Sequence, residues 1–517
     1  MQSVNALPER YNFAASLLAL NAGRGAKVAY VDDAREVTYG SLAERVKRFA
    51  ALLGDAGVRP EERILVVMQD TVDLPTTFLG ALYAGVVPVL VNTLLTSADY
   101  AYMIEHSSAR LVVVSAPLVP KVREALTGLP DAPQLLVSNA PGVAEDDGQA
   151  FDFEERLAAV HPREQPSDTH ADDIAFWLYS SGSTGRPKGT VHTHANIHWT
   201  VELYAKPILG IRETDVVYSA AKLFFAYGLG NGLTFPLSVG ATTVLMAGRP
   251  TPEAVFGCLT KHGATLFAGV PTLYLAMLAS PARPPRAACA LRVCASAGET
   301  LPAKVGDEFT AHFGCHILDG LGSTEMLHIY LSNRPDDVVY GTTGVAVPGY
   351  EIELRDDAGA PVAIEELGDL YVKGPSAALL YWRDRDKSRA TFQGAWVKTG
   401  DRYQQLPSGH YKYAGRSDDM LKVSGQYVSP VEVELALQLH DTVLEAAVVG
   451  RLDGNGLVRI FAFVVLRAGH AGDDALVTAL QGFVKERLAP HKYPREIVFV
   501  DGLPKTATGK IQRFKLR

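Results

Sequence analysis

The sequence is poor in cysteine, and none of its cysteines belongs to a metal-binding motif. The four cysteines are Cys258, Cys289, Cys294 and Cys315, and no CxxC pair occurs. Sparse, unpaired cysteines are typical of reduced thiols in a cytosolic protein and not of a disulfide framework or a zinc site. We therefore expect free, buried thiols and a cytoplasmic location.

Long hydrophobic runs and an excess of positive charge are also missing. The longest apolar run, residues 79–91, is too short to cross a bilayer and contains Pro88. The N-terminal stretch carries Glu9 and Arg10 and lacks the apolar segment of a signal peptide. The net charge of -8 gives no overall basic field for nucleic acid or an anionic membrane. An anionic substrate must then be attracted by local positive groups.

The length and the order of apolar segments predict an α/β protein with more than one domain. The chain has 517 residues, which exceeds the size at which one hydrophobic core usually stops growing. Short apolar runs alternate with amphipathic stretches, which favours parallel strands connected by helices. The expected strands are residues 64–67, 110–114, 174–178, 242–246 and 265–268. The expected helices are residues 41–53, 195–204 and 252–262.

A change of composition near Gly415 indicates a second, smaller domain. Residues 415–430 are polar and charged and contain glycine and serine. Beyond them, the patterns predict a compact α+β unit with strands 444–449, 460–466 and 496–500 and helices 430–439 and 474–488. We place the domains at residues 1–417 and 418–517, with a hinge at Asp418. The alternative is a surface loop inside one domain. Residues 141–149 are expected to form an exposed acidic loop.

The most informative motif is a loop rich in glycine and hydroxyl side chains. Residues 179–189 read Tyr-Ser-Ser-Gly-Ser-Thr-Gly-Arg-Pro-Lys-Gly and follow the expected strand 174–178 directly. Glycines let backbone N–H groups approach phosphate oxygens, and hydroxyls add further donors. The candidate phosphate-binding residues are Ser180, Ser181, Gly182, Ser183, Thr184, Gly185 and Lys188.

This loop is not a Walker A motif, which has glycine directly before its lysine and serine or threonine after it. Here Pro187 precedes Lys188 and Gly189 follows it. Pro187 also disfavours helix at Arg186. The loop is therefore predicted to be a mobile flap and not the start of a helix.

The whole string resembles the phosphate-loop signature of the adenylate-forming enzymes, which include acyl-CoA synthetases, luciferases and peptide-synthetase adenylation domains. Four further segments match this family in its order, so the resemblance covers nearly the whole chain. It implies a large N-terminal α/β domain of parallel and mixed sheets with flanking helices, and a small mobile α+β C-terminal domain. It also implies that ATP, Mg²⁺ and coenzyme A are bound.

Two of the further segments resemble the family's nucleotide site. Residues 296–299 resemble the turn against the adenine ring, which implies ATP contacts from Ala297, Gly298 and Glu299. Residues 319–325 imply further ATP contacts from Asp319 and Gly320, a contact of Thr324 with the α-phosphate, and Mg²⁺ binding by Glu325. Mg²⁺ takes oxygen ligands and is usually shared between carboxylates and nucleotide phosphates, so this role suits Glu325.

The other two segments resemble the ribose site and the catalytic lysine. In residues 398–401 and 415–418, Asp401 and Arg416 resemble the ribose contacts, and Asp418 occupies the hinge position. The loop that follows resembles the coenzyme A tunnel, which implies Ser424, Gly425 and Gln426. Lys510 resembles the lysine that catalyses adenylation. A lysine acetyltransferase acting on Lys510 would remove its charge and stop that step.

An aromatic, glycine-rich segment, residues 223–231, resembles the acyl pocket of this family. Taken with residues 326–333, it is more similar to benzoate–CoA ligases than to ligases of long-chain fatty acids. The implied pocket residues are Ala226, Tyr227, Gly322, His328 and Ile329. His328 alone could instead be a structural histidine, and an aromatic run alone could be plain core.

The resemblance implies an ATP-dependent ligase that converts a small aromatic acid, benzoate above all, and coenzyme A to a thioester through an acyl-adenylate. Three alternatives remain open. The acid could be 2-aminobenzoate, 4-hydroxybenzoate or a medium-chain fatty acid; the acceptor could be a carrier protein; or the chain could be a non-catalytic sensor. The expected partners are small molecules and neither nucleic acid nor membrane, in a monomer or a homodimer.

Overall fold

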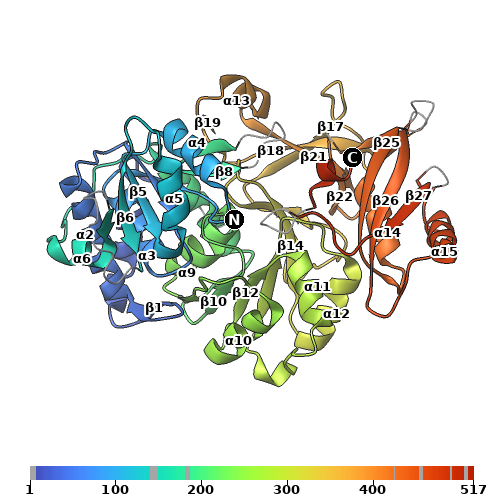
Figure 1. The fold of residues 1–517 in the computed structure, drawn as a ribbon, viewed down its shortest axis with the longest axis horizontal. Helices are drawn as coiled ribbons and strands as arrows, with labels where there is room; N and C mark the ends of the chain where they lie inside the picture. Colours follow the sequence, from blue (N-terminus) through green and yellow to red (C-terminus); the bar gives the residue numbers. More distant parts are fainter. Residues whose placement is uncertain are drawn as a thin grey trace.

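The structure is a computed structural model. It describes residues 7–139, 150–180, 187–417, 419–423, 426–452, 458–489, 492–505 and 511–517. The predicted acidic loop at residues 141–149 lies outside these residues. In the described part of the chain, an N-terminal body of two large sheets is followed by a smaller C-terminal unit at the right of Figure 1.

One large sheet is built around the expected strands of the first third of the chain. Its central strands pair in parallel, and their side chains are almost all buried, as expected for strands covered on both faces. Only β9 and β19 run antiparallel to their neighbours. The strand order is β19 (Leu380–Tyr381), β9 (Lys188–Thr193), β8 (Ile174–Ser180), β4 (Val87–Leu90), β3 (Arg63–Val67), β5 (Leu111–Ser115), β6 (Gln134–Ser138) and β7 (Ala150–Asp152).

The second large sheet is mixed. Its middle strands are parallel, whereas β14, β15 and β16 form an antiparallel edge. The strand order is β16 (Val345–Ala346), β15 (Ile329–Ser332), β14 (Ile317–Gly322), β13 (Val293–Ser296), β12 (Leu266–Gly269), β10 (Val216–Ser219), β11 (Thr242–Val244), β1 (Val28–Val31) and β2 (Glu36–Thr38).

Helices cover these two sheets. The helix expected at residues 252–262 forms with those bounds, because Thr251 caps its first turn and Gly263 ends it in the left-handed conformation. The helix expected at residues 195–204 is shorter than predicted and continues as a π-helical turn. The helices are α1 (Phe13–Leu20), α2 (Tyr39–Asp55), α3 (Asp73–Tyr83), α4 (Ser97–Ser107), α5 (Val119–Leu126), α6 (Phe153–Ala159), α7 (His194–Thr200) with the π turn η3 (Val201–Ala205), α10 (Pro252–His262), α11 (Pro271–Ala279), α12 (Ala303–Phe313) and α13 (Arg385–Thr391).

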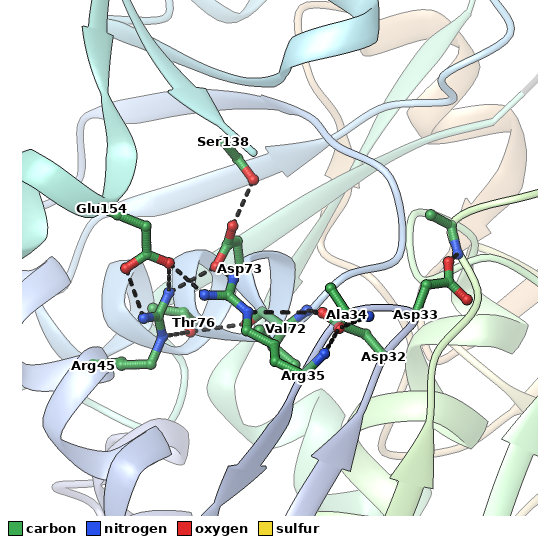
Figure 2. Close-up of polar contacts among 11 residues, drawn as sticks. Asp32, Asp33, Ala34, Arg35, Arg45, Val72, Asp73, Thr76, Ser138 and Glu154 are labelled. Carbon is green, nitrogen blue, oxygen red and sulfur yellow. Dashed lines mark hydrogen bonds and ion pairs between the residues drawn. The ribbon is translucent and has the colours of Figure 1, made fainter. Parts of the chain in front are cut away.

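A buried ion cluster ties α2, α3 and α6 together, away from the candidate site (Figure 2). Asp73, which is fully buried, accepts hydrogen bonds from Arg35, from Arg45 at 2.7 Å and from Ser138 at 2.7 Å. Arg45 also contacts Glu154 at 2.8 Å. A buried carboxylate is tolerated only when it is paired and hydrogen-bonded, so loss of either arginine would destabilise this layer.

A smaller antiparallel sheet and the C-terminal unit complete the described fold. The smaller sheet contains β17 (Glu351–Arg355), β18 (Leu367–Lys373), β21 (Trp396–Gln405), β20 (Phe392–Gln393) and β22 (Tyr411–Arg416). The C-terminal unit matches the predicted α+β pattern. It consists of β23 (Leu421–Val423), β24 (Gln426–Val428), α14 (Pro430–Gln438), β25 (Val443–Leu452), β26 (Val458–Leu466), α15 (Asp474–Lys485) and β27 (Glu496–Phe499).

The cysteines are free thiols, as predicted, but only two of them are buried. Cys294 and Cys315 lie side by side with their sulfurs 3.7 Å apart. The prediction of burial is wrong for Cys258 and Cys289, because they lie at the edge of the hydrophobic cluster beneath α10 to α12. Among the described residues, no helix is long and apolar enough to span a membrane.

Candidate active site

The phosphate-loop motif connects two antiparallel strands. Residue Ser180 ends β8 and pairs with Lys188, which begins β9. The predicted binding residues Ser181, Gly182, Ser183, Thr184 and Gly185 lie outside the described part of the chain, as does Arg186. The Ser180 hydroxyl is buried without a hydrogen-bond partner among the described residues, so it is available to a ligand.

Lys188 lies beside the predicted metal ligand Glu325. Its Nζ is 4.4 Å from the centre of the Tyr381 ring, and the Tyr381 hydroxyl donates a 2.7 Å hydrogen bond to Glu325 Oε1. Burial lowers the pKa of Lys188, while the Glu325 carboxylate opposes this shift. Burial and the Glu325 charge raise the pKa of Tyr381, so this phenol stays protonated and acts as a donor. The three side chains form one charged cluster.

Tyr381 was not predicted from the sequence. It reaches the site because β19 pairs with β9, which aligns Tyr381 with Thr190. This pairing joins segments far apart in the chain, so no local sequence signal could have identified it. A backbone hydrogen bond also joins the segment before β19 to the Glu325 turn, because Ala378 N–H donates to the Glu325 carbonyl at 2.8 Å.

The predicted Thr324–Glu325 pair lies on a tight, strained turn. Leu327 N–H donates to the Thr324 carbonyl at 3.1 Å, and Leu327 itself has a φ of 63°. A bulky residue with positive φ is uncommon and costs about 1–3 kcal/mol, so the surrounding structure must hold it. His192 is one of the residues that contact this turn, because its Nε2 is 2.8 Å from the Thr324 carbonyl.

The predicted adenine turn lies at the ends of two parallel strands. β13 and β14 align Ser296 with Asp319, and Gly298 adopts a φ of 96°. The carboxyl ends of adjacent parallel strands are common ligand sites. Burial raises the pKa of Asp319 to about 8, although the Ser296 hydroxyl and the backbone of Leu301 and Gly320 oppose this rise. Asp319 and Ser296 thus lie together as two buried polar groups at this position.

The predicted ribose pair is also brought together. β21 and β22 align Asp401 with Arg416, and Arg416 Nη1 lies 3.2 Å from Asp401 Oδ1. Gly400 has a φ of 76°, and a Cβ placed there would lie 2.7 Å from Arg416 Nη2. Glycine at this position therefore serves both the backbone conformation and the close approach of the guanidinium.

His328 is surrounded by aromatic rings at the predicted acyl pocket. The aromatic, glycine-rich segment that is assigned to the same pocket forms α8 (Ala226–Leu229), the π turn η4 (Gly230–Thr234) and α9 (Phe235–Leu237). The His328 ring lies 5.6 Å from Tyr227, 5.2 Å from Tyr204 and 4.5 Å from Phe235 between ring centres. A Cβ on Gly230 would lie 2.4 Å from the His328 ring. These contacts pack His328 among aromatic rings, and its role in an acyl pocket stays a prediction.

Burial lowers the pKa of His328 to about 3, so its ring is neutral at physiological pH. It therefore cannot attract a carboxylate by charge. Its Nε2 is 3.4 Å from the Tyr227 carbonyl and 3.5 Å from Asn231 Nδ2, and its Nδ1 has no partner among the described residues. The Tyr227 hydroxyl and Asn231 Oδ1 are likewise buried and without partners among those residues.

The other predicted pocket residues lie around the same turn. Ala226 is partly exposed next to Tyr227, and Ile329 is buried at the start of β15. A Cβ on Gly322 would lie 2.7 Å from the His328 carbonyl, and one on Gly320 would lie 3.0 Å from Ile329 Cδ1. Both glycines therefore permit close packing of β14 against β15. The roles assigned to them stay predictions.

Several predicted residues lie outside the described chain: Asp418, Ser424, Gly425 and Lys510. The backbone of Gln426 pairs with Val423 in a short hairpin, but its side chain is not described. Glu299 is half-buried beside Gly298.

Glu325 suits the predicted Mg²⁺. The described residues contain no cluster of three or more metal-binding side chains. Mg²⁺ bound to a nucleotide needs only one or two carboxylates, because phosphates and water supply its other ligands. Tyr381 engages Oε1 of Glu325, so one carboxylate can hold the metal while its orientation is fixed. A site with Glu325 as its one carboxylate therefore fits Mg²⁺ bound to a nucleotide.

Two family models match this chain. The model described as AMP-binding enzyme matches residues 19–382, and the AMP-binding enzyme C-terminal domain matches residues 432–510.

Curated relatives and solved structures match almost the full length. A benzoate–CoA ligase from Thauera aromatica is 56% identical over 99% of this chain and 96% of its own length. A 4-hydroxybenzoate–CoA/benzoate–CoA ligase from Rhodopseudomonas palustris is 47% identical over 98% of this chain and 94% of its own. The crystal structure of a benzoate CoA ligase from Burkholderia xenovorans superposes with a TM-score of 0.93 at 63% identity, covering 98% of this chain and 100% of that one.

Proposed function

Because the chain belongs to the AMP-binding enzyme family, we propose that it is an AMP-forming ligase that joins benzoate to coenzyme A at the expense of ATP. The identity to benzoate–CoA ligases supports this choice of acid. The structural observation that carries it is the enclosure of the neutral His328 by Tyr204, Tyr227 and Phe235 beside the Thr324–Glu325 turn. Aromatic walls favour a flat ring, and ring pairs add about 0.5–1.5 kcal/mol beyond buried area.

In the first half-reaction, a benzoate oxygen attacks the α-phosphorus of ATP and pyrophosphate leaves. Catalysis of such a step is mainly positioning and charge stabilisation. Lys188, Thr324 and the phosphate loop hold the triphosphate, and Glu325 would hold Mg²⁺. When bound, Mg²⁺ supplies positive charge that offsets the charge of the phosphates. Asp401 accepts hydrogen bonds from the ribose hydroxyls, with Arg416 beside it. Lys510 serves as the charge between carboxylate and α-phosphate.

In the second half-reaction, the thiol of coenzyme A attacks the carbonyl of benzoyl-adenylate and AMP leaves. The thiol loses its proton, and the bond from the carbonyl carbon to the phosphate oxygen breaks. The small domain of residues 418–517 rotates about Asp418 between the two steps, and the loop with Ser424, Gly425 and Gln426 lines the entry of coenzyme A. Acetylation of Lys510 would stop the first step but not the second.

A second candidate is a benzoate with a hydroxyl or amino group on its ring. Two buried groups without partners among the described residues support it, Nδ1 of His328 and the hydroxyl of Tyr227. A ring hydroxyl, which both donates and accepts, could hydrogen-bond to each of them. A site that hydrogen-bonds a substrate hydroxyl discriminates strongly, by about 10⁴–10⁵, against the analogue that lacks it. Comparable rates for benzoate and 4-hydroxybenzoate would therefore mean that these bonds are not formed.

The test is an assay of purified protein with ATP, Mg²⁺ and coenzyme A against benzoate, 2-aminobenzoate, 4-hydroxybenzoate, hexanoate and palmitate. AMP release and thioester mass are followed together. The proposal requires benzoyl-CoA to form with AMP in equal amounts while palmitate is inert. Formation of AMP without a thioester would move the acceptor to a carrier protein, and a preference for hexanoate would contradict the pocket assignment.

A further inference from the structure

His192 contacts the turn that contains Thr324 and Glu325. It lies on β9, the strand that also carries the predicted phosphate ligand Lys188. It is fully buried on β9, four residues after Lys188. Side chains at even spacing on a strand point to the same face, so His192 and Lys188 both face the turn of Thr324 and Glu325. The His192 ring stacks on Phe176, its partner across the β8–β9 pair, with centres 5.2 Å apart and planes at 19°.

The two ring nitrogens of His192 both face oxygen acceptors. Nε2 is 2.8 Å from the Thr324 carbonyl, and Nδ1 is 3.2 Å from Asn196 Oδ1. The orientation of Asn196 is fixed, because its Nδ2 donates to the carbonyls of Pro375 and Ala377 at 3.2 Å. Its Oδ1 also accepts from Thr193 N–H at 3.0 Å. Asn196 therefore cannot offer a donor to His192.

A neutral imidazole has one N–H, so only one of these two contacts can be a hydrogen bond. Burial lowers the pKa of His192 to about 4, which keeps the ring neutral at physiological pH. The shorter contact identifies Nε2 as the donor to the Thr324 carbonyl. The stack on Phe176 and the packing near Asn196 then orient the ring. The hydrogen bond from Nε2 to the Thr324 carbonyl is the only one that the ring donates.

We propose that His192 is a positioning residue, which fixes the Thr324 carbonyl and thereby holds the Thr324 hydroxyl and the Glu325 carboxylate toward the nucleotide. The turn needs such support, because Leu327 adopts a positive φ and the Thr324 carbonyl accepts from only Leu327 and His192 among the described residues. This inference rests on the proposed function, in which Thr324 and Glu325 handle ATP and its metal.

The test uses three substitutions at His192 that separate the two nitrogens. His192→Gln retains an N–H donor at the reach of Nε2, whereas His192→Asn retains one only at the reach of Nδ1. His192→Phe retains the ring stack but no donor. We expect His192→Gln to stay within about 3-fold of wild type in kcat/KM for ATP, and His192→Asn and His192→Phe to lose about 10-fold, the typical effect of one lost hydrogen bond. The KM for benzoate should change little in all three.

The matched control is His194→Asn. His194 is also buried two residues along, but its Nδ1 accepts from Phe13 N–H at 3.3 Å, on the side of α1. This substitution should lower the melting temperature without changing the KM for ATP. Equal loss in all three His192 variants, or no loss in His192→Phe, would overturn the proposal. Either result would show that the use of ATP does not depend on an N–H donor at the position of Nε2.

A second readout does not depend on the acid. Long-range ¹H–¹⁵N correlation spectra should show His192 as the neutral Nε2–H tautomer, and calorimetric ATP affinity should fall in His192→Asn and His192→Phe but not in His192→Gln. If wild type forms no benzoyl-CoA, the proposed function fails, whereas the ATP affinities still decide the role of His192. An Nδ1–H tautomer would overturn the inference even in an active ligase.

Discussion

The Tyr381 hydroxyl donates a 2.7 Å hydrogen bond to Glu325 Oε1, and its ring lies beneath the ammonium group of Lys188. One side chain thus contacts both the carboxylate and the cation of the predicted ATP site. A hydrogen bond to a charged group contributes about 1.5–3 kcal/mol, so Tyr381→Phe should lower kcat/KM for ATP by at least about 10-fold. The KM for benzoate should stay near that of wild type.

Comparison of Tyr381→Leu with Tyr381→Phe separates the two contacts of Tyr381. It removes the hydroxyl and also the ring beneath Lys188, and a cation over an aromatic face gains about 0.5–2 kcal/mol. We expect a larger loss than in Tyr381→Phe, measured by pyrophosphate exchange with benzoate and ATP. If both variants exchange pyrophosphate like wild type, Tyr381 does not orient Glu325 in the working enzyme.

Lys188 should give the ATP step an alkaline limit. Burial lowers its pKa, so its charge is lost at a lower pH than that of an ordinary lysine with a pKa of 10.5. ATP binding should therefore weaken as pH rises through this lowered pKa. Lys188→Arg keeps its charge at high pH, so its relative ATP affinity should decline less on the alkaline side. Lys188→Gln should lose about 10²–10³ in adenylation rate at neutral pH.

Binding isotherms for ATP between pH 7 and 10 distinguish these variants. Lys206→Gln is the matched control, because Lys206 is exposed just after η3 and pairs with Glu202. It should follow the wild-type pH profile. A profile in Lys188→Arg with the same alkaline decline as wild type would assign that decline to another group.

Gly400 makes room for Arg416 at the predicted ribose site. Its φ is 76°, and an added Cβ would lie 2.7 Å from Arg416 Nη2. Gly400→Ala should therefore both strain the backbone and displace Arg416, raising the KM for ATP. Gly409→Ala is a close control, since its φ is 86° and nothing lies within 4 Å of its added Cβ. Both variants should lose thermal stability, but only Gly400→Ala should bind ATP more weakly.

Gly230 packs closely against His328 at the predicted acyl pocket. Its backbone has an ordinary φ of -61°, so alanine causes no backbone strain, but the new Cβ would lie 2.4 Å from the His328 ring. We expect Gly230→Ala to raise the KM for benzoate by about 10-fold or more, because one methylene of misfit is worth about 1–3 kcal/mol. The KM for ATP should be unchanged. Gly257→Ala, with open space in α10, is the control.

The sequence predicted those elements whose signals are local. The bounds of α10 follow from the Thr251 cap and the turn at Gly263, and the amphipathic C-terminal segments gave the α+β unit. The order of the motifs also predicted that some residues from different motifs lie close together, such as Asp401 and Arg416. Asp401 and Arg416 are neighbours because β21 and β22 form a hairpin, and a hairpin is a short-range feature.

Contacts set by distant strands were not predicted. Tyr381 depends on the pairing of β19 with β9, and His192 depends on the turn at Thr324, which lies far along the chain. The sequence predicts continuous helix where the π turn follows α7, because apolar periodicity does not distinguish the two over one turn. The neutrality of His328 and Asp319 follows from burial, which the sequence alone does not give.

Asp319 should make the unliganded protein lose stability as pH rises. Burial raises the pKa of Asp319 to about 8 in the folded chain, far above the ordinary aspartate value of 3.8. Between these two values the folded state holds a proton that the unfolded state has released, so stability falls with rising pH and levels off above about 8. Asp319→Asn removes this titration and should gain melting temperature over wild type as pH is raised from 5 to 8. Scanning calorimetry of both proteins without ATP measures this difference. A constant difference across that range would show that Asp319 is ionised in the folded protein and that an unseen partner, such as bound water, stabilises its charge.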